Sequence, residues 1–316
     1  MYSFNSLLLM SLALLFPGQG SQYVGMGRSL ARAYPEAARV FEEADDVLGF
    51  SITQLAWEGP EENLVLTKNA QPAMLAHSTA VYRVIQDRLG EVGLAAGHSL
   101  GEFSAHVAAG TLDFAAAVIT VRLRGELMYD AGVERPGSMA AVIGLDDEAV
   151  VSVCEQAEEE AGVCVPANFN APGQVVISGD LVGVGRAMEL AAELGAKRVV
   201  RLSVSGAFHS PLMEPVAVEF EPWLEQQSFH DPGFPIIANV TAEPVSTGDA
   251  ARALLVQQLT TPVQWAASVL HMAESGVDRF LEIGPGSVLR GLNRRIVKPV
   301  PCASLGEPDD LEVWEP

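Results

Sequence analysis

The sequence is poor in cysteine and in basic residues. Its 316 residues include only Cys154, Cys164 and Cys302, whose spacing fits neither a disulfide framework nor a metal site. Nineteen Lys and Arg stand against 40 Asp and Glu, and the net charge of −21 argues against nucleic acid or an anionic membrane as a partner. The cysteine usage indicates a reducing cytoplasm, and we expect a monomer with no bound metal or cofactor.

A hydrophobic run long enough to cross a bilayer, about 20 residues, is also missing. The apolar segment from Ser6 to Phe16, SLLLMSLALLF, has no Lys or Arg before it and no small-residue cleavage site after it, unlike a signal peptide. It runs directly into PGQGSQ, so we interpret it as a buried parallel strand that ends in a glycine-rich turn. Because a complete strand already starts at Met10, we expect residues 1–9 to be a dispensable extension.

Hydrophobic residues, by contrast, make up 49% of the chain, enough for a sizeable core. Helical and strand patterns alternate without repeats or low-complexity segments, which is typical of α/β proteins. The segment from Gln71 to Leu89, for example, predicts a helix with Pro72 in its first turn. A short predicted strand, residues 92–96, follows it.

The pattern changes near Arg135. The elements predicted beyond it are a strand over 137–145, a helix over 146–160, two strands within 164–179, a helix over 181–195 and a strand over 197–204. This βαββαβ order is that of the ferredoxin-like motif. We therefore predict a small ferredoxin-like α+β domain at 136–205, inserted into a large α/β-hydrolase-like domain with a parallel sheet, formed by 1–135 and 206–316.

Ser99 stands at a predicted strand-to-helix turn in LAAGHSLGEFSAHVAAG. A serine at this position is often only a helix cap, because its oxygen satisfies a free backbone N–H. The flanking Gly97 and Gly101 instead favour a nucleophile elbow, in which small neighbours let the serine project into a cleft. The following helix would place the Leu100 N–H and a positive helix end beside an oxyanion formed on Ser99.

A nucleophilic serine needs a base, and the sequence has six histidines. His98 adjoins Ser99, so its side chain should point away from the serine at the turn. Three others, His77, His106 and His271, lie in segments with a helical pattern, and nothing in these segments indicates a catalytic role. His209 differs because it lies in VSGAFHSPLMEP, a loop that follows the last strand of the predicted small domain, and it is the best candidate for the base.

Seven segments, which include those of Ser99 and His209, form an ordered series: FPGQGSQYVGMG, GHSLGEFSAHVAAG, RLRGELM, NFNAPGQVVISG, GAFHSPLM, QQLTTPVQW and EIGPGSVLRGL. In this order they resemble the malonyl-CoA:acyl carrier protein transacylase family. The resemblance spans about residues 10–297, nearly the whole chain. A lone glycine-X-serine-X-glycine motif would be weak support, whereas seven ordered segments are specific.

The resemblance implies a two-step acyl transfer in fatty-acid or polyketide biosynthesis. Ser99 would attack the thioester of malonyl-CoA with His209 as general base, and the phosphopantetheine thiol of an acyl carrier protein would then take the malonyl group. In the family a backbone carbonyl, here that of Gln258, orients the histidine. Backbone N–H groups, here those of Gln19 and Leu100, form the oxyanion hole.

The resemblance also implies which residues select the substrate. Arg124 falls at the family position whose guanidinium binds the malonyl carboxylate bidentately, whereas Arg122 fits a solvated helix residue. An unpaired buried guanidinium would disfavour a neutral acetyl group. Gln71 would line the cleft, and Phe208 resembles the malonyl-selecting residue of related polyketide-synthase acyltransferases. Because GAFHS replaces the PSHC type of some fatty-acid enzymes, both client pathways stay open.

Acyl carrier proteins are acidic, as is this chain, so attraction between the two needs a local basic patch. The candidates, all in the segment VLRGLNRRIVK, are Arg290, Arg294, Arg295 and Lys298. Basic residues near the end of a helix also favour the helix dipole. Docking and this structural role are therefore both open.

Two other function classes fit parts of the sequence. A serine hydrolase, either an esterase of the α/β-hydrolase type or an editing acyl hydrolase of the same family, would let water take the acyl group. Arg124 argues against a simple esterase, whose neutral substrates offer it no carboxylate. A non-catalytic scaffold is a third class, against which the presence of Ser99, His209 and Arg124 argues.

Overall fold

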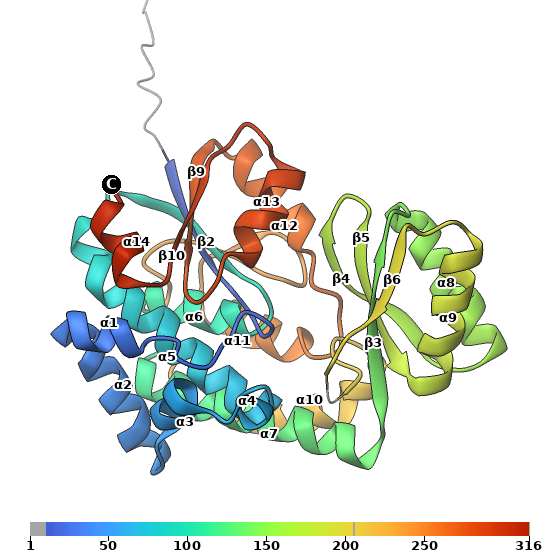
Figure 1. The fold of residues 1–316 in the computed structure, drawn as a ribbon, viewed down its shortest axis with the longest axis horizontal. Coiled ribbons are helices and arrows are strands. Elements are labelled where there is room, and N and C mark those ends of the chain that lie inside the picture. Colours follow the sequence, from blue (N-terminus) through green and yellow to red (C-terminus); the bar gives the residue numbers. More distant parts are fainter. Residues whose placement is uncertain (1–10, 205, 316) are drawn as a thin grey trace, which may run out of the picture.

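The structure is a computed structural model that describes residues 11–204 and 206–315. Figure 1 shows a large part, residues 11–134 and 206–315, beside a small part, residues 137–201. The large part contains a mostly parallel sheet and the small part an antiparallel one, which confirms the predicted α/β class. Residues 1–9, the predicted extension, lie outside the described residues.

The large part is organised around a six-stranded sheet in the order β10-β9-β1-β2-β7-β8. Its strands are β1 (Ser11–Phe16), β2 (Val92–Gly97), β7 (Ile236–Ile237), β8 (Pro244–Val245), β9 (Val277–Ile283) and β10 (Cys302–Leu305). All neighbours are parallel except β7 and β8. Strands from both ends of the chain thus pair in one sheet.

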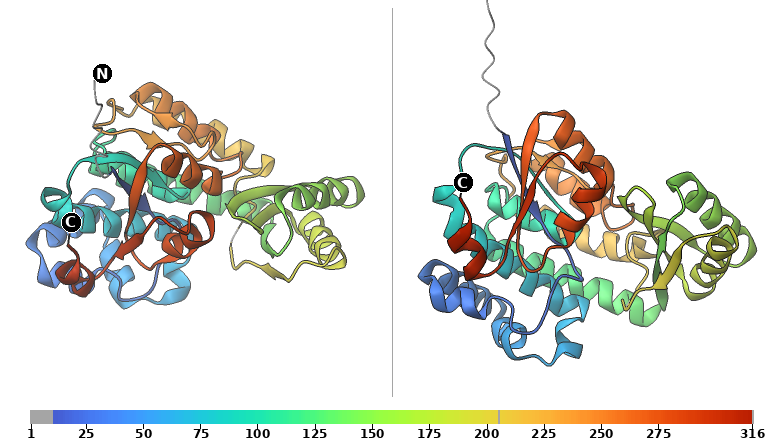
Figure 2. Two further views of the ribbon diagram at one scale, coloured as in Figure 1. Left: turned by 90° about the horizontal axis from the view of Figure 1, so that it is seen from above. Right: turned by 45° about the horizontal axis from the view of Figure 1, so that its top comes forward.

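Helices cover both faces of this sheet. They are α1 (Arg28–Ala33), α2 (Pro35–Leu48), α3 (Ile52–Glu58), α4 (Glu61–Leu64), α5 (Thr67–Ile85), α6 (Leu100–Ala108), α7 (Phe114–Glu134), α10 (Glu214–Glu225), α11 (Gly248–Gln257), α12 (Trp265–Glu274), α13 (Val288–Ile296) and α14 (Pro308–Val313). Short 3-10 turns follow α5 at Gln86–Arg88 and precede α10 at Pro211–Met213. Figure 2 shows the blue and cyan helices before residue 100 on the opposite side of the sheet from α12 and α13, in orange and red.

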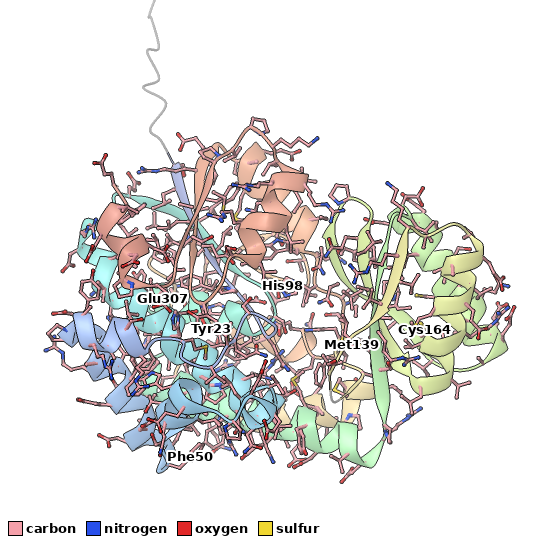
Figure 3. The ribbon with its side chains drawn as sticks, in the orientation of Figure 1. Tyr23, Phe50, His98, Met139, Cys164 and Glu307 are labelled. Carbon is pink, nitrogen blue, oxygen red and sulfur yellow. The ribbon has the colours of Figure 1, made fainter. Side chains whose placement is uncertain are left out.

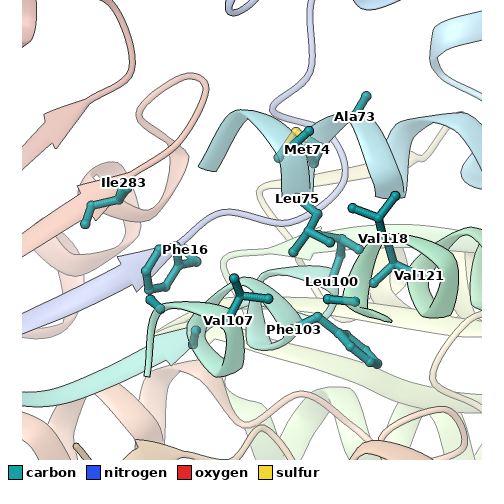
Figure 4. Packing of buried hydrophobic residues seen from close by; sticks show 14 of the residues in the cluster. Phe16, Ala73, Met74, Leu75, Leu100, Phe103, Val107, Val118, Val121 and Ile283 are labelled. Carbon is teal, nitrogen blue, oxygen red and sulfur yellow. The ribbon is translucent and has the colours of Figure 1, made fainter. Parts of the chain in front are cut away.

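The central strand β1 shows why two layers form. Leu12, Leu14 and Phe16 pack in the cluster that includes α2, α5, α6 and α7, whereas Ala13 and Leu15 pack against α12 and α13. Successive strand residues point to opposite faces, so a continuous apolar run fits a strand buried on both sides. Figure 4 shows Phe16 in the first cluster, close to the helices of that layer.

The helix predicted from Gln71 begins four residues earlier, at Thr67, so that Pro72 lies inside α5 and not in its first turn. A proline has no N–H, and the carbonyl four residues before it loses its helical partner. Arg122 Nη1 donates to that carbonyl, Lys68 O, at 3.0 Å. Arg122 therefore joins α7 to α5. It also pairs with Glu126 of its own helix at 2.6 Å, so it is not simply solvated, in contrast to the expectation from the sequence.

The small part has the predicted order of elements. They are β3 (Gly137–Ile143), α8 (Asp147–Glu160), β4 (Cys164–Ala171), β5 (Gln174–Asp180), α9 (Leu181–Glu193) and β6 (Arg198–Arg201). The sheet order is β4-β5-β3-β6, with antiparallel neighbours. Asp146 and Asp180 cap α8 and α9 by accepting from Ala149 N and Gly183 N. The domain boundaries at 135/136 and 205/206 stay a prediction.

Backbone hydrogen bonds join the two parts beside β4. Phe169 N donates to Val263 O, and Val263 N donates to Ala167 O, each at 2.9 Å. This bridge fixes the segment between α11 and α12 against the small sheet. Within residues 11–204 and 206–315, no helix combines the length and the apolar character that a membrane span requires.

Candidate active site

Ser99 lies at the turn between β2 and α6 with φ 51° and ψ −108°, and such a positive φ is unusual for a residue other than glycine. The neighbouring backbone is close: a Cβ on Gly97 would lie 1.9 Å from the carbonyl carbon of Gly101, and one on Gly101 would lie 2.0 Å from Phe16 O. Only glycine fits at these two positions. The Ser99 side chain does not cap α6, so the alternative of a simple helix cap does not describe it.

The Ser99 hydroxyl instead contacts His209. Ser99 Oγ lies 2.8 Å from His209 Nε2, and His209 Nδ1 lies 2.8 Å from Gln258 O. A carbonyl oxygen only accepts, so Nδ1 carries the proton and Nε2 accepts from the serine hydroxyl. Burial, with a smaller contribution from the positive charge of Arg124, lowers the pKa of His209 to about 3. The imidazole is therefore neutral, the form that a general base needs.

The other histidines lie away from Ser99 Oγ. His98 Nε2 is 2.8 Å from Asn170 Oδ1 of β4, so this side chain points away from the serine, as expected. In Figure 3, His98 lies on the edge of the large part that faces Met139 of β3. His77 and His106 are buried within α5 and α6, and His271 lies 3.5 Å from Glu243.

Arg124 reaches the same point from α7 and is 1% exposed. Its Nη1 donates to Gln71 Oε1 at 2.8 Å, and its Nη2 donates to Gln258 Oε1 at 2.8 Å and to Ser99 Oγ at 3.3 Å. Burial lowers the pKa of Arg124 to about 10, although the negative charge of Glu102 raises this pKa. The guanidinium thus stays charged at neutral pH, and the three acceptors that it contacts are uncharged.

Three groups in this network were not predicted from the sequence: Glu102, Asn239 and the side chain of Gln258. Glu102 Oε2 accepts from Gln258 Nε2 at 2.6 Å and from Asn239 N at 3.3 Å. Asn239 Oδ1 accepts from Ser99 N at 2.7 Å, and its Nδ2 donates to Gly97 O at 2.6 Å. A carboxylate in the first turn of a predominantly apolar helix could have drawn attention to Glu102, whereas no local pattern marks Asn239.

A cavity of about 400 Å³ opens onto Ser99 Oγ between the two parts. Of the residues that the sequence placed in the site, those that line it are Gln19, Gln71, Ser99, Leu100, Arg124, Phe208 and His209. The Gln19 side chain donates to Val65 O and Thr67 Oγ1, which holds its loop against the start of α5. The small part adds Met139 and Asn168, and Leu202, Ser203 and Val204 follow β6, so three of the five residues of this wall are apolar.

The four basic candidates for docking lie on or just after α13. Arg294, Arg295 and Lys298 are exposed and Arg290 is half-buried, and none of the four lines the described cavity. Arg295 Nη2 donates to Pro172 O at 3.0 Å, and Nη1 contacts Gln174 Oε1. Arg295 therefore joins α13 to the β4–β5 hairpin, and its charge is partly engaged within the chain.

Comparison with known proteins adds independent evidence. The acyl transferase domain family matches residues 13–307. The chain is 46% identical over 300 residues to the malonyl CoA-acyl carrier protein transacylase of Escherichia coli K12, covering 95% of this chain and 97% of the relative. It is 44% identical over 302 residues to the Bacillus subtilis protein of the same name, covering 96% and 95%.

Solved structures give the same result. An acyl carrier protein S-malonyltransferase from Vibrio cholerae superposes with a TM-score of 0.92 at 43% identity, over 96% of this chain and 99% of that one. A malonyl-transacylase in complex with its holo acyl-carrier protein from a type II polyketide synthase also has a TM-score of 0.92 at 43% identity, over 96% and 98%.

Proposed function

The chain belongs to the acyl transferase domain family, and on that premise we propose that Ser99 carries a malonyl group between coenzyme A and an acyl carrier protein. The protein is an acyltransferase with malonyl-CoA as acyl donor and acyl carrier protein as acceptor. The observation that carries the residue assignment is the position of Ser99 Oγ, 2.8 Å from His209 Nε2 and 3.3 Å from Arg124 Nη2.

In the first half-reaction, His209 Nε2 takes the hydroxyl proton while Ser99 Oγ attacks the thioester carbonyl carbon. The negative charge moves to the carbonyl oxygen, which the backbone N–H groups of Gln19 and Leu100 would stabilise. Leu100 is the first residue of α6, so its N–H has no acceptor within the helix. As the carbon–sulfur bond breaks, His209 returns the proton to the sulfur of coenzyme A, and a malonyl-serine ester remains.

The second half-reaction runs the same chemistry in reverse. The phosphopantetheine thiol of the carrier gives its proton to His209 and attacks the ester carbonyl, and Ser99 Oγ leaves and regains the proton. The Gln258 carbonyl holds Nδ1–H throughout and stabilises the imidazolium, the role that a carboxylate has in a catalytic triad.

Arg124 supplies the selection for a carboxylated acyl group. Its guanidinium is buried and its contacts are uncharged oxygens, so a malonyl carboxylate would give it an opposite charge that an acetyl group cannot provide. Gln71 would hold the guanidinium from the other side, and Phe208 would limit space beside the acyl group. A hydrolase is not favoured, because a family of acyl transferases covers nearly the whole chain.

Several finer points belong to the same proposal. The exposed Arg294 and Lys298 support docking of an acidic carrier on α13, beside the half-buried Arg290 and the partly engaged Arg295. Free cysteines in the described residues support a reducing cytoplasm. We also propose that the protein is a monomer and that its carrier protein serves fatty-acid or polyketide biosynthesis.

Intact-mass spectrometry tests the proposal. Mixed with malonyl-CoA, the protein should gain one malonyl group, and adding a holo acyl carrier protein should move that group to the carrier. A hydrolase would instead lose the adduct to water as malonate at the same rate with or without the carrier. Absence of any adduct on the wild type would contradict the covalent mechanism.

A further inference from the structure

Glu102 is a buried carboxyl group for which the mechanism above has no role. It lies in the first turn of α6, three residues after Ser99, and is 2% exposed. Burial raises the pKa of Glu102 to about 7, although its hydrogen bonds with Gln258 and Asn239 act in the opposite direction. A buried carboxyl group is costly unless it is hydrogen-bonded, so its two partners indicate its role.

The first partner is the Gln258 carboxamide. Ionised Glu102 can only accept, so Gln258 Nε2, 2.6 Å from Glu102 Oε2, must be the donor. The other end of the carboxamide, Oε1, then faces Arg124 Nη2 and accepts from it at 2.8 Å. A reversed carboxamide would place the Nε2 donors against the guanidinium donors. Glu102 therefore fixes which atom of Gln258 meets Arg124.

Gln258 also connects this contact to the serine and the histidine. Its Nε2 donates to Ser99 O at 3.1 Å, and its backbone carbonyl accepts from His209 Nδ1 at 2.8 Å. The second partner of Glu102, Asn239 N, belongs to the residue whose Oδ1 accepts from Ser99 N. Ser99, His209 and Arg124 are thus each joined to Glu102 through one intervening residue.

We propose that Glu102 is a positioning residue that orients the Gln258 carboxamide and, through it, the Arg124 guanidinium, and that it thereby contributes to the preference for a carboxylated over a neutral acyl group. This inference rests on the proposed function. Glu102 is not among the described residues that line the cavity, so it acts through Gln258 and not on the substrate.

The test compares Glu102→Met, which has no acceptor oxygen, with Glu102→Gln, whose amide oxygen can still accept from Gln258. The control is Glu282, a second buried carboxyl group, which binds Leu289 N and Arg290 N at 2.9 and 3.0 Å at the start of α13. The measurement is kcat/KM for Ser99 acylation by malonyl-CoA and by acetyl-CoA, together with crystal structures of wild type and Glu102→Met.

Glu102→Met should lower the malonyl-to-acetyl ratio roughly tenfold to a hundredfold, the range for losing a hydrogen bond to a charged group. Glu102→Gln should restore most of the ratio, and Glu282→Met should leave it unchanged while lowering the melting temperature. If Glu102→Met does not fold, Gln258→Met, which keeps the backbone carbonyl at His209, should lower the ratio in the same way.

An equal loss of malonyl and acetyl acylation in the variant that folds would overturn the proposal and make Glu102 purely structural. The crystal structures separate this failure from that of the proposed function. If the wild type forms no malonyl adduct, the function is wrong, and the position of the carboxamide alone decides. A Gln258 carboxamide still within hydrogen-bond distance of Arg124 Nη2 in Glu102→Met would refute the positioning role, and a carboxamide displaced from Arg124 would support it.

Discussion

The cores of the large and small parts differ in what they bury. The small part packs valine, alanine, leucine and cysteine between its sheet and two helices, with Asp146 and Asp180 confined to helix caps. The large part buries Glu102, Arg124 and His209 at one point, each with 4% exposure or less. Buried polar and charged groups cost free energy unless they are hydrogen-bonded, and these three are joined through Gln258.

The difference indicates a division of roles. The large part buries charged groups where the proposed chemistry needs them, whereas the small part contributes only the uncharged residues Met139 and Asn168 to the cavity. Changes in the buried network should therefore alter the reaction by orders of magnitude. Acidic pH should lower the stability of the large part more than that of the small part. Substitutions at the surface should have small effects on the reaction.

The largest effect is expected for Ser99→Ala, which removes the attacking oxygen. No malonyl adduct should form on brief exposure to malonyl-CoA, measured by intact mass. Ser104→Ala is the matched control, because Ser104 is a buried serine in the same helix, and it should acylate as the wild type does. A malonyl adduct that persists on Ser99→Ala would show that another residue carries the acyl group.

Lowering the pH from 7 to 5 should weaken the large part more than the small one. Burial lowers the pKa of His77 to about 4 and those of His106 and His209 to about 3, below the ordinary 6.5. As the pH falls through 6.5, the unfolded chain binds protons that the folded chain does not, which costs about 2 kcal/mol per histidine at pH 5. Glu102, with its pKa raised to about 7, and Glu282, whose pKa burial also raises, have the opposite effect, but burial also lowers the pKa of a fourth histidine of the large part, His98.

Residues 137–201 contain no histidine, so hydrogen exchange can compare the two parts. After correction for intrinsic rates, protection of amides in α5 and α6 should fall roughly a hundredfold between pH 7 and 5, and that of β3 and β5 should change less. Equal loss of protection in α5 and α6 and in β3 and β5 would mean that the two parts unfold as one unit.

The smallest effect is expected at the surface of α13. Arg294→Glu with Lys298→Glu should slow transfer to the carrier about two- to fivefold, in a salt-sensitive way, and leave acylation by malonyl-CoA unchanged. Arg39→Glu with Arg83→Glu makes the same charge change at exposed positions on other helices and should affect neither step. A similar slowing of both steps would point to a role in binding coenzyme A or to damaged folding.

Local sequence patterns predicted much of the fold. The turn around Ser99 and the βαββαβ order were predictable, because glycine-flanked turns and apolar periodicity lie within short windows of sequence. The start of α5 was not, since the carbonyl freed by Pro72 is satisfied by Arg122, more than 50 positions away. The contact of Arg295 with Pro172 likewise could not be predicted from the sequence.

The site was predictable only in part for the same reason. Ser99, His209 and Arg124 lie in recognisable segments, and the structure brings them together. Glu102 and Asn239 contact each other across 137 positions, and no local pattern encodes such a pair. The hydrogen bonds that orient the site therefore become visible only in three dimensions.

The central claim is that buried Arg124 selects the carboxylated acyl group, and adduct formation from malonyl-CoA and acetyl-CoA on Arg124→Ala tests it most directly. Losing one partner of a buried charge pair costs about 3–5 kcal/mol, so malonyl acylation should fall roughly two to four orders of magnitude. Acetyl acylation should hold or rise, and Arg122→Ala, the neighbouring control, should keep the malonyl preference. A uniform fall for both thioesters on Arg124→Ala would contradict the account.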